Sequence, residues 1–164
     1  MHDTQRGILL LPPEYKDIRG PLIFLAGPIQ GALDWHECAI DCLHTLNSSI
    51  NIASPRRTYL DEQFVYEAQV DWETHHLRKS SLILFWLAKE ANHMCDRAYA
   101  QTTRVEIGEW MVRHQFQGKK LVIGIEKGYT GEKYLRRRFS QDCPGVPILD
   151  SLEKSCKKVI EYIS

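Results

Sequence analysis

The chain has 164 residues, of which 43% are hydrophobic, and this is enough for one globular domain with a substantial core. Its 21 basic side chains balance its 21 acidic ones, so no net field attracts a nucleic acid polymer or an anionic membrane surface. A small-molecule ligand is therefore the first expectation.

The five cysteines contain no C-x-x-C pair of the kind found in zinc ribbons and redox motifs. The apolar run at residues 8–11 is too short for a signal peptide, and no stretch approaches the ~20 apolar residues of a membrane span. These features predict reduced thiols and a cytoplasmic protein. Residues 1–20, which contain Pro12, Pro13 and Gly20, are expected to form an arm or irregular lead-in, and residues 21–164 a single domain.

Apolar runs separated by segments of helical periodicity follow one another along the chain. The clearest runs predict strands buried on both faces, at residues 22–26, 83–87 and 121–125. Two weaker runs, 50–53 and 146–149, extend the sheet. The second can lie only at an edge, because Pro147 has no backbone N–H to donate.

Helical stripes fill the gaps between these runs. The first stripe consists of Trp35, Cys38, Ala39, Cys42 and Leu46. The second lies on a helix from about Asp61 to Lys79 and consists of Tyr66, Val70, Glu73 and Leu77. The third consists of Ile107, Trp110, Met111 and His114. The alternation of strand and helix predicts an α/β fold with a parallel sheet, whose ligands bind beyond the carboxyl ends of the strands.

The loop AGPIQG, at residues 26–31, follows the first predicted strand. It has neither the Gly-Lys-Ser/Thr ending of a P-loop nor the spacing of G-x-G-x-x-G. Two interpretations stay open for it. Its glycines let backbone N–H groups approach an oxygen-rich ligand at a helix start, or they simply make a tight turn.

The segment HECAIDCLH, at residues 36–44, places four metal-ligand side chains close together in sequence. We expect no metal there, because helical geometry puts Cys38 and Cys42 on the apolar stripe and directs His36 and His44 elsewhere.

Glu73 occupies a position on the apolar stripe, with Gln69 four residues earlier beside it. A carboxylate there is costly unless it has a partner. One interpretation is a glutamate at the edge of the stripe that reaches water or pairs with Arg78 or His76. The other is a carboxyl group in a cleft wall, with a pKa raised by partial burial, that handles a proton or a ligand hydroxyl.

Glu106 also has two interpretations. The segment from Thr103 to Glu106 satisfies the capping box S/T-x-x-E, in which the glutamate bonds back to the start of its own helix. Alternatively, a helix N-terminus lowers the pKa of Glu106 and keeps it ionised as a nucleophile. Gly108 then removes side-chain bulk where another group approaches closely.

Four segments together resemble the nucleoside 2-deoxyribosyltransferase-like family. They are IFLAGPIQG followed by Trp35, YEAQVDWETHHL, LILFWLAKE and TTRVEIGEW, in that order within residues 21–135. The resemblance implies a flavodoxin-like (Rossmann-like) three-layer sandwich with a parallel sheet of roughly five strands. It also implies cleavage of the N-glycosidic bond of a nucleoside or nucleotide by a retaining mechanism, without a cofactor.

The resemblance also implies roles for single residues. Glu106 corresponds to the nucleophile that holds the sugar as a glycosyl ester, and Glu73 to an acidic position facing the sugar or base. Glu73 or Asp71 assists the leaving base as the second acid. Substrate contacts are expected from Gly27, Pro28, Ile29, Gln30, Trp35, Gln69, Trp86 and Arg104.

The chain departs from the family pattern in a long polar loop at residues 89–103. The positive charges of Arg104, Arg56 and Arg57 raise the alternative of a phosphorylated substrate. The resemblance further implies a homo-oligomer, a dimer or higher. Two matters stay open: whether a second base or water accepts the sugar, and whether the chain is instead a catalytically idle nucleotide-binding sensor or interaction domain.

Overall fold

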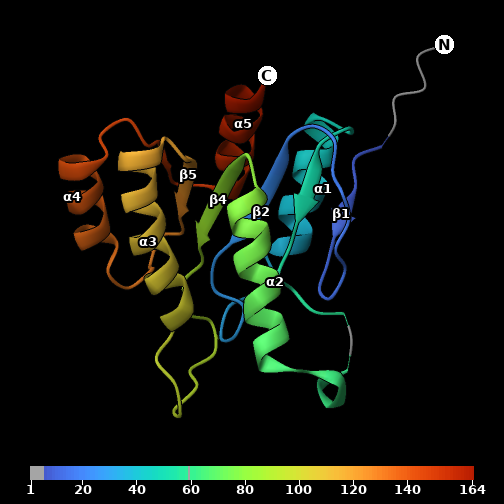
Figure 1. Ribbon diagram of the computed structural model, residues 1–164. Helices are drawn as coiled ribbons and strands as arrows, with labels where there is room; N and C mark the ends of the chain where they lie inside the picture. Colours follow the sequence, from blue (N-terminus) through green and yellow to red (C-terminus); the bar gives the residue numbers. More distant parts are fainter. Residues whose placement is uncertain (1–5, 59) are drawn as a thin grey trace.

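A computed structural model describes residues 6–58 and 60–164. Within them, a parallel sheet of six strands runs through the centre of the molecule (Figure 1). Its strands are β1 (Leu9–Leu10), β2 (Leu22–Ala26), β3 (Asn51–Ala53), β4 (Leu82–Leu87), β5 (Lys120–Ile125) and β6 (Ile148–Leu149). Their spatial order is β1-β3-β2-β4-β5-β6, and every neighbouring pair is parallel.

This strand order confirms the flavodoxin-like α/β architecture. Counted from β2, the sheet has the flavodoxin-like order 2-1-3-4-5, and β1 is added outside β3. The sheet therefore has six strands rather than the expected five. The chain reverses its direction of growth between β2 and β4, and loops that leave the carboxyl ends of these two strands border the usual ligand crevice of such sheets.

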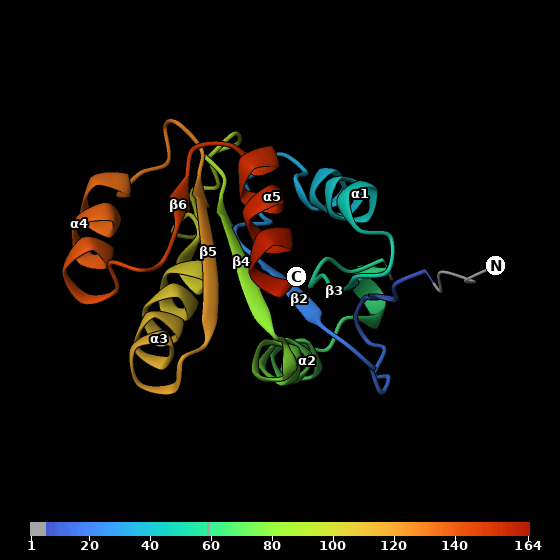
Figure 2. The ribbon, with the colours of Figure 1, turned by 90° about the horizontal axis from the view of Figure 1, so that it is seen from above.

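Two layers of helices cover the sheet (Figure 2). The helices are α1 (His36–Leu46), the short 3-10 helix η1 (Asp61–Gln63), α2 (Tyr66–Lys79), α3 (Gln101–Gln117), α4 (Glu132–Asp142) and α5 (Leu152–Ile163). Side chains of α1 and α5 pack on one face of the sheet, and those of α2, α3 and α4 pack on the other. The result is the expected three-layer sandwich.

The strongest predicted strands are confirmed almost to the residue, because every residue of β2 and β4 is buried. β6 pairs only with β5 at the edge, as Pro147 requires. Strand β1 was not predicted from the sequence, and it lies in the segment expected to be an arm or irregular lead-in. Leu9 and Leu10 pair with β3, and the side chain of Asn51 accepts a hydrogen bond from the backbone N–H of Ile8 at 2.9 Å.

The helical stripes are only partly as predicted. On α1, Cys38 and Leu46 are exposed, whereas His36 is buried and the pKa of its imidazole is lowered to about 3 by that burial. His36 therefore lies on the buried face from which it was excluded. The apolar stripe predicted for HECAIDCLH was therefore wrong. Exposed Cys38 and buried His36 nevertheless lie in different surroundings.

On α2, the buried face consists of Trp72, His76 and Leu77. Tyr66 and Val70, which were placed on the apolar stripe, are exposed. The predicted stripe differs because it counted apolar residues and left out His76, whose polar ring is buried. The Trp72 ring packs against that of His76 with centroids 4.0 Å apart. Burial on α2 therefore follows ring packing as well as hydrophobicity.

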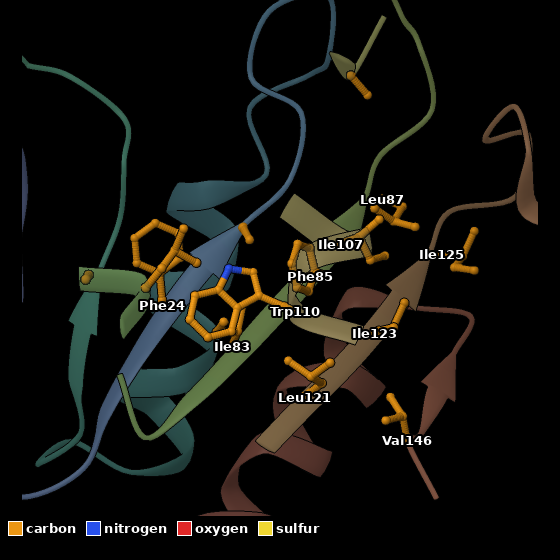
Figure 3. Close-up of a cluster of buried hydrophobic side chains, with 14 of the residues drawn as sticks. Phe24, Ile83, Phe85, Leu87, Ile107, Trp110, Leu121, Ile123, Ile125 and Val146 are labelled. Atoms are coloured by element: carbon orange, nitrogen blue, oxygen red, sulfur yellow. The ribbon is translucent and has the colours of Figure 1, made fainter. Parts of the chain in front are cut away.

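The core beneath α2 and α3 fixes these two helices on the same face of the sheet. Ile107 and Trp110 of α3 lie over Phe85 and Ile123 of the strands (Figure 3). The ammonium group of Lys119 then joins the C-terminal ends of the two helices. It donates to the carbonyl of Leu77 at 2.8 Å and lies 5.0 Å from the Trp110 ring centroid.

All four tryptophans, Trp35, Trp72, Trp86 and Trp110, are buried. Among the described residues, no helix is long and apolar enough to cross a membrane.

Candidate active site

The loops after β2 and β4 meet at the carboxyl edge of the sheet. The carbonyl of Gly31 accepts hydrogen bonds from the backbone N–H groups of Ala91, at 2.8 Å, and Asn92, at 3.0 Å. The side chain of Arg97 donates to the Gln30 amide oxygen. These bonds tie the long polar loop at residues 89–103 to AGPIQG, so the two loops border the crevice together.

Close packing holds the AGPIQG loop from beneath. The indole N–H of Trp35 donates to the carbonyl of Pro28 at 2.8 Å. A Cβ on Gly27 would lie 2.2 Å from the backbone oxygen of Trp86, so only glycine fits there. The expected helix start is absent from the loop itself, since α1 begins at His36, after Gly31 and four further residues.

Trp35 and Trp86 do not wall an open pocket. Their exposed fractions are only 5% and 6%, and both side chains pack in the layer of α1 and α5. Glu73 and Glu106 come from α2 and α3, on the opposite face of the sheet. The two tryptophans therefore support the loop rather than face the carboxylates, while Ile29 and Gln30 of that loop are exposed.

The capping-box interpretation of Glu106 is wrong. Helix α3 begins at Gln101 after Ala100, which has a left-handed backbone (φ 55°), and no side chain caps it. The backbone N–H of Arg104 bonds to the carbonyl of Ala100 at 2.9 Å, so Thr103 lies inside the first turn. Glu106 is therefore one turn further into the helix than the N3 position, and its carboxyl group is left for another partner.

Glu73 and Glu106 are brought together across the contact of α2 and α3. Burial is the largest cause that raises the pKa of Glu106 to about 8. The negative charge of Glu73 is the second cause. This contradicts the sequence-based expectation of a lowered pKa. Burial and a second carboxylate outweigh the helix dipole here, because Glu106 lies beyond the first turn, where that dipole is strongest.

Glu73 is the better stabilised anion of the pair. Burial raises its pKa, as expected, but the Gln69 side-chain amide donates to its Oε1 at 2.7 Å and the charge of Arg57 also opposes the rise. The same amide donates to the carbonyl of Pro55 at 3.0 Å, at the carboxyl end of β3. Gln69 therefore positions Glu73 at the edge of the sheet, and a proton shared by the two carboxyl groups rests mainly on Glu106.

Two predicted site residues lie away from this pair. Asp71 is exposed on the outer side of α2, in a shallow cavity with Tyr15 and His75. Arg104 bonds to the hydroxyl of Tyr129 in the segment after β5. Arg104 precedes Glu106 by two residues, about 200° around α3, so the two side chains point in different directions.

The arginines after β3 also have partners. Arg56 forms an ion pair with Asp34, and the guanidinium of Arg57 lies 4.0 Å from the Phe64 ring centroid. From the sequence, both were considered only as positive charges for a phosphorylated substrate, and the effect of Arg57 on Glu73 was not predicted. The position of Arg57 in the segment that follows β3 was the signal that could have indicated it. In the described part of the chain, no cluster of three His, Cys, Asp or Glu side chains is arranged for a metal.

The fold and these residues define a class of protein: a flavodoxin-like domain with two interacting glutamates beside its strand-order switch. A comparison with known families agrees. Residues 20–129 match the family described as nucleoside 2-deoxyribosyltransferase like, and the chain belongs to that family. The family description indicates nucleoside 2-deoxyribosyltransferase-like chemistry on a small-molecule nucleoside.

Among solved structures, the fold is similar to a conserved protein from Enterococcus faecalis V583. The two share 12% sequence identity with a TM-score of 0.59, over 88% of this chain and 99% of the other. This likeness concerns the fold alone. No curated protein matches the chain.

Proposed function

We propose that the protein cleaves the N-glycosidic bond of a nucleoside or nucleotide with retention of configuration, through a covalent glycosyl ester on Glu106. The sugar, a ribosyl or deoxyribosyl group, then passes to a second base or to water. The observation that carries this proposal is the interacting pair of Glu106 and Glu73, in which burial and the charge of Glu73 raise the pKa of Glu106 to about 8, so that Glu106 keeps a proton at neutral pH. A site that only binds a nucleotide has no need of two mutually repelling carboxyl groups.

The shared proton fits the chemistry of a leaving base. As the glycosidic bond breaks, positive charge develops on the sugar ring and negative charge on the base. The proton leaves the carboxyl pair for the base, either directly or through Glu73, and Glu106 becomes a carboxylate beside the oxocarbenium-like sugar. Its oxygen then bonds to the anomeric carbon. The pair begins with one negative charge, and afterwards Glu73 carries it while the ester and the protonated base are neutral.

In the second half of the reaction, Glu73 takes a proton from the incoming base or water, which attacks the anomeric carbon and releases Glu106. How well the loops at residues 27–35 and 89–103 exclude water decides between transfer and hydrolysis. Exposed Ile29 and Gln30 supply ligand contacts in this proposal, and Gln69 positions Glu73. Asp71 and Arg104 take no direct part, since both point away from the carboxyl pair.

The test is release of free base from a panel of deoxynucleosides, ribonucleosides and their monophosphates, with and without an acceptor base. The wild-type protein is expected to release base from at least one of them, and Glu106→Gln to lose this activity by at least ~1,000-fold. Glu161→Gln, on α5 and paired with Lys158, is the matched control and keeps the activity.

A slow substrate fluorinated on the sugar is expected to leave a glycosyl adduct on Glu106 in mass spectrometry. Substantial turnover by Glu106→Gln would show that the nucleophile is misassigned. Tight binding of one nucleotide without release of base from any of them would instead favour the idle sensor.

We further propose that the protein forms a homo-oligomer through α3. Val105, Val112 and Phe116 follow one line along the outer side of this helix, and the exposed fractions of Val105 and Phe116 are 72% and 78%. Gly108 lies on the same side, and a Cβ there would contact nothing within 4 Å. An apolar line with a glycine at its middle suits close packing against the same helix of a second copy.

A further inference from the structure

Two cysteine side chains meet on the face of the sheet opposite the carboxyl pair. Cys156 of α5 is completely buried, and its sulfur lies 4.0 Å from the backbone oxygen of Ala39 in α1. Cys42, one turn after Ala39, packs against the same cluster, and its thiol is a neighbour of the Cys156 thiol. The pair therefore joins two helices that are far apart in sequence and adjacent in space (Figure 2).

The two thiols differ in their access to solvent. Cys42 is half-buried, so a small oxidant can reach it, whereas Cys156 has no exposed surface. Burial and the neighbouring Cys42 raise the pKa of the Cys156 thiol far above its usual range. Cys156 is therefore poorly suited to react first and well placed to react with an oxidised Cys42 beside it.

We propose that Cys42 and Cys156 are a redox modification site, at which a peroxide converts the two thiols into a reversible disulfide between α1 and α5. The Cys42 thiolate attacks a peroxide oxygen and becomes a sulfenic acid, while the other oxygen leaves as water or an alcohol. The Cys156 sulfur then attacks the Cys42 sulfur, and the hydroxyl group leaves with the Cys156 proton as water. Two thiols are oxidised by two electrons, and one peroxide bond is reduced.

The position of this bond links it to the loop at the candidate active site. α1 follows Trp35, which holds the carbonyl of Pro28. On α5, Ser155 precedes Cys156. A Cβ added to Gly124 would lie 2.4 Å from the Oγ of Ser155 and 2.5 Å from the Trp86 ring, so Ser155 and the Trp86 ring both lie close to Gly124. A disulfide here would fasten α1 to α5 in the layer that contains Trp35 and Trp86, and we expect it to stabilise the folded state by constraining the unfolded chain.

The experiment uses the full chain with Cys38→Ser and Cys95→Ser, since these exposed thiols would otherwise cross-link different molecules. After treatment with hydrogen peroxide at a stoichiometric dose, we expect the intact mass to fall by two hydrogen atoms. Non-reducing peptide mapping should join the peptides of Cys42 and Cys156. The melting temperature should rise by several degrees. Dithiothreitol should reverse the mass loss, the cross-link and the rise in melting temperature.

The same treatment of the chain that also carries Cys42→Ser should give neither the mass loss nor the rise in melting temperature. Peptide mapping of the unaltered protein serves as a second measurement that requires no variant to fold. A Cys42 that stops at sulfenic or sulfinic acid without a cross-link, a disulfide that uses Cys143 instead, or no oxidation of Cys42 would each overturn the proposal.

Discussion

The carboxyl group of Glu106 holds a proton near neutral pH because α2 places Glu73 beside it and the core shields both from water. Gln69 and Arg57 favour the charge on Glu73 instead. The sequence contains all four residues, but the direction of the pKa shift on Glu106 depends on a contact between two helices. Local patterns such as T-R-V-E do not report such contacts, which is why the expected lowering of the pKa was wrong.

The rate of base release is expected to fall above about pH 8, where the carboxyl pair loses its shared proton. The loss should approach about tenfold per pH unit, because one proton is required on the leaving base. A pH profile of kcat/KM for the best substrate in the panel measures this. A rate that stays constant from pH 7 to pH 10 would contradict the role of the proton.

The same pKa shift makes the stability of the protein depend on pH. Between the ordinary pKa of 4.5 and the folded value of about 8, the folded protein keeps a proton that the unfolded chain releases. The contribution of Glu106 to the free energy of unfolding of the wild-type protein is therefore fully present below pH 4.5 and is lost as the pH rises toward 8. The amide in Glu106→Gln does not ionise, so this variant keeps its stability as the pH rises. It should melt several degrees higher than wild type at pH 9, but at a similar temperature at pH 5.

Thermal unfolding at both pH values checks this prediction, and Glu161→Gln, with its exposed side chain on α5 on the other face of the sheet, is the control. A Glu106→Gln variant that is equally or less stable than wild type at pH 9 would indicate that Glu106 is not withdrawn from water as described.

Among the elements, those whose two faces are both buried were the most predictable. β2 and β4 are continuous apolar runs, so no partner had to be known to recognise them. β1 is only two residues long and owes its place to pairing with β3 and to Asn51, which sequence periodicity does not reveal. On α1, polar His36 is buried and apolar Leu46 exposed, because tertiary packing overrides the preference of single residues.

The strand-to-helix connection after β2 depends on Gly27. We expect Gly27→Ala to lower the free energy of unfolding by at least ~2 kcal/mol, because the added Cβ would collide with the backbone oxygen of Trp86. Gly145→Ala is the matched control, since a Cβ there meets nothing within 4 Å. Urea unfolding of both variants gives the comparison, and equal stability would show that the loop can move away from β4.

For the whole molecule, the sequence predicted the three-layer fold and indicated the two glutamates as candidates, but it did not indicate which side of the sheet each residue faces. Trp35 and Trp86 were expected to contact the substrate because of the family resemblance, yet both lie in the opposite layer from Glu73 and Glu106. Asp71 and Arg104 are close to Glu73 and Glu106 in sequence and point elsewhere in space. Only the packing of the helices on the sheet could separate these residues.

The proposed oligomer belongs to this scale as well. A charge in the apolar line on α3, as in Phe116→Glu, should shift the protein toward the monomer in light scattering after size-exclusion chromatography. Leu46→Glu on α1, on the other side of the sheet, should leave the assembly unchanged. A wild-type protein that is monomeric at high micromolar concentration would rule out this interface.

The burial of every tryptophan gives the protein a built-in optical signal. Trp72 and Trp110 lie in the layer of α2 and α3, and Trp35 and Trp86 in the layer of α1 and α5. Their fluorescence should be blue-shifted in the native state and move to longer wavelength when water reaches the indoles. Because Trp35 and Trp86 support the AGPIQG loop, ligand-induced movement of that loop should change the emission without any added label.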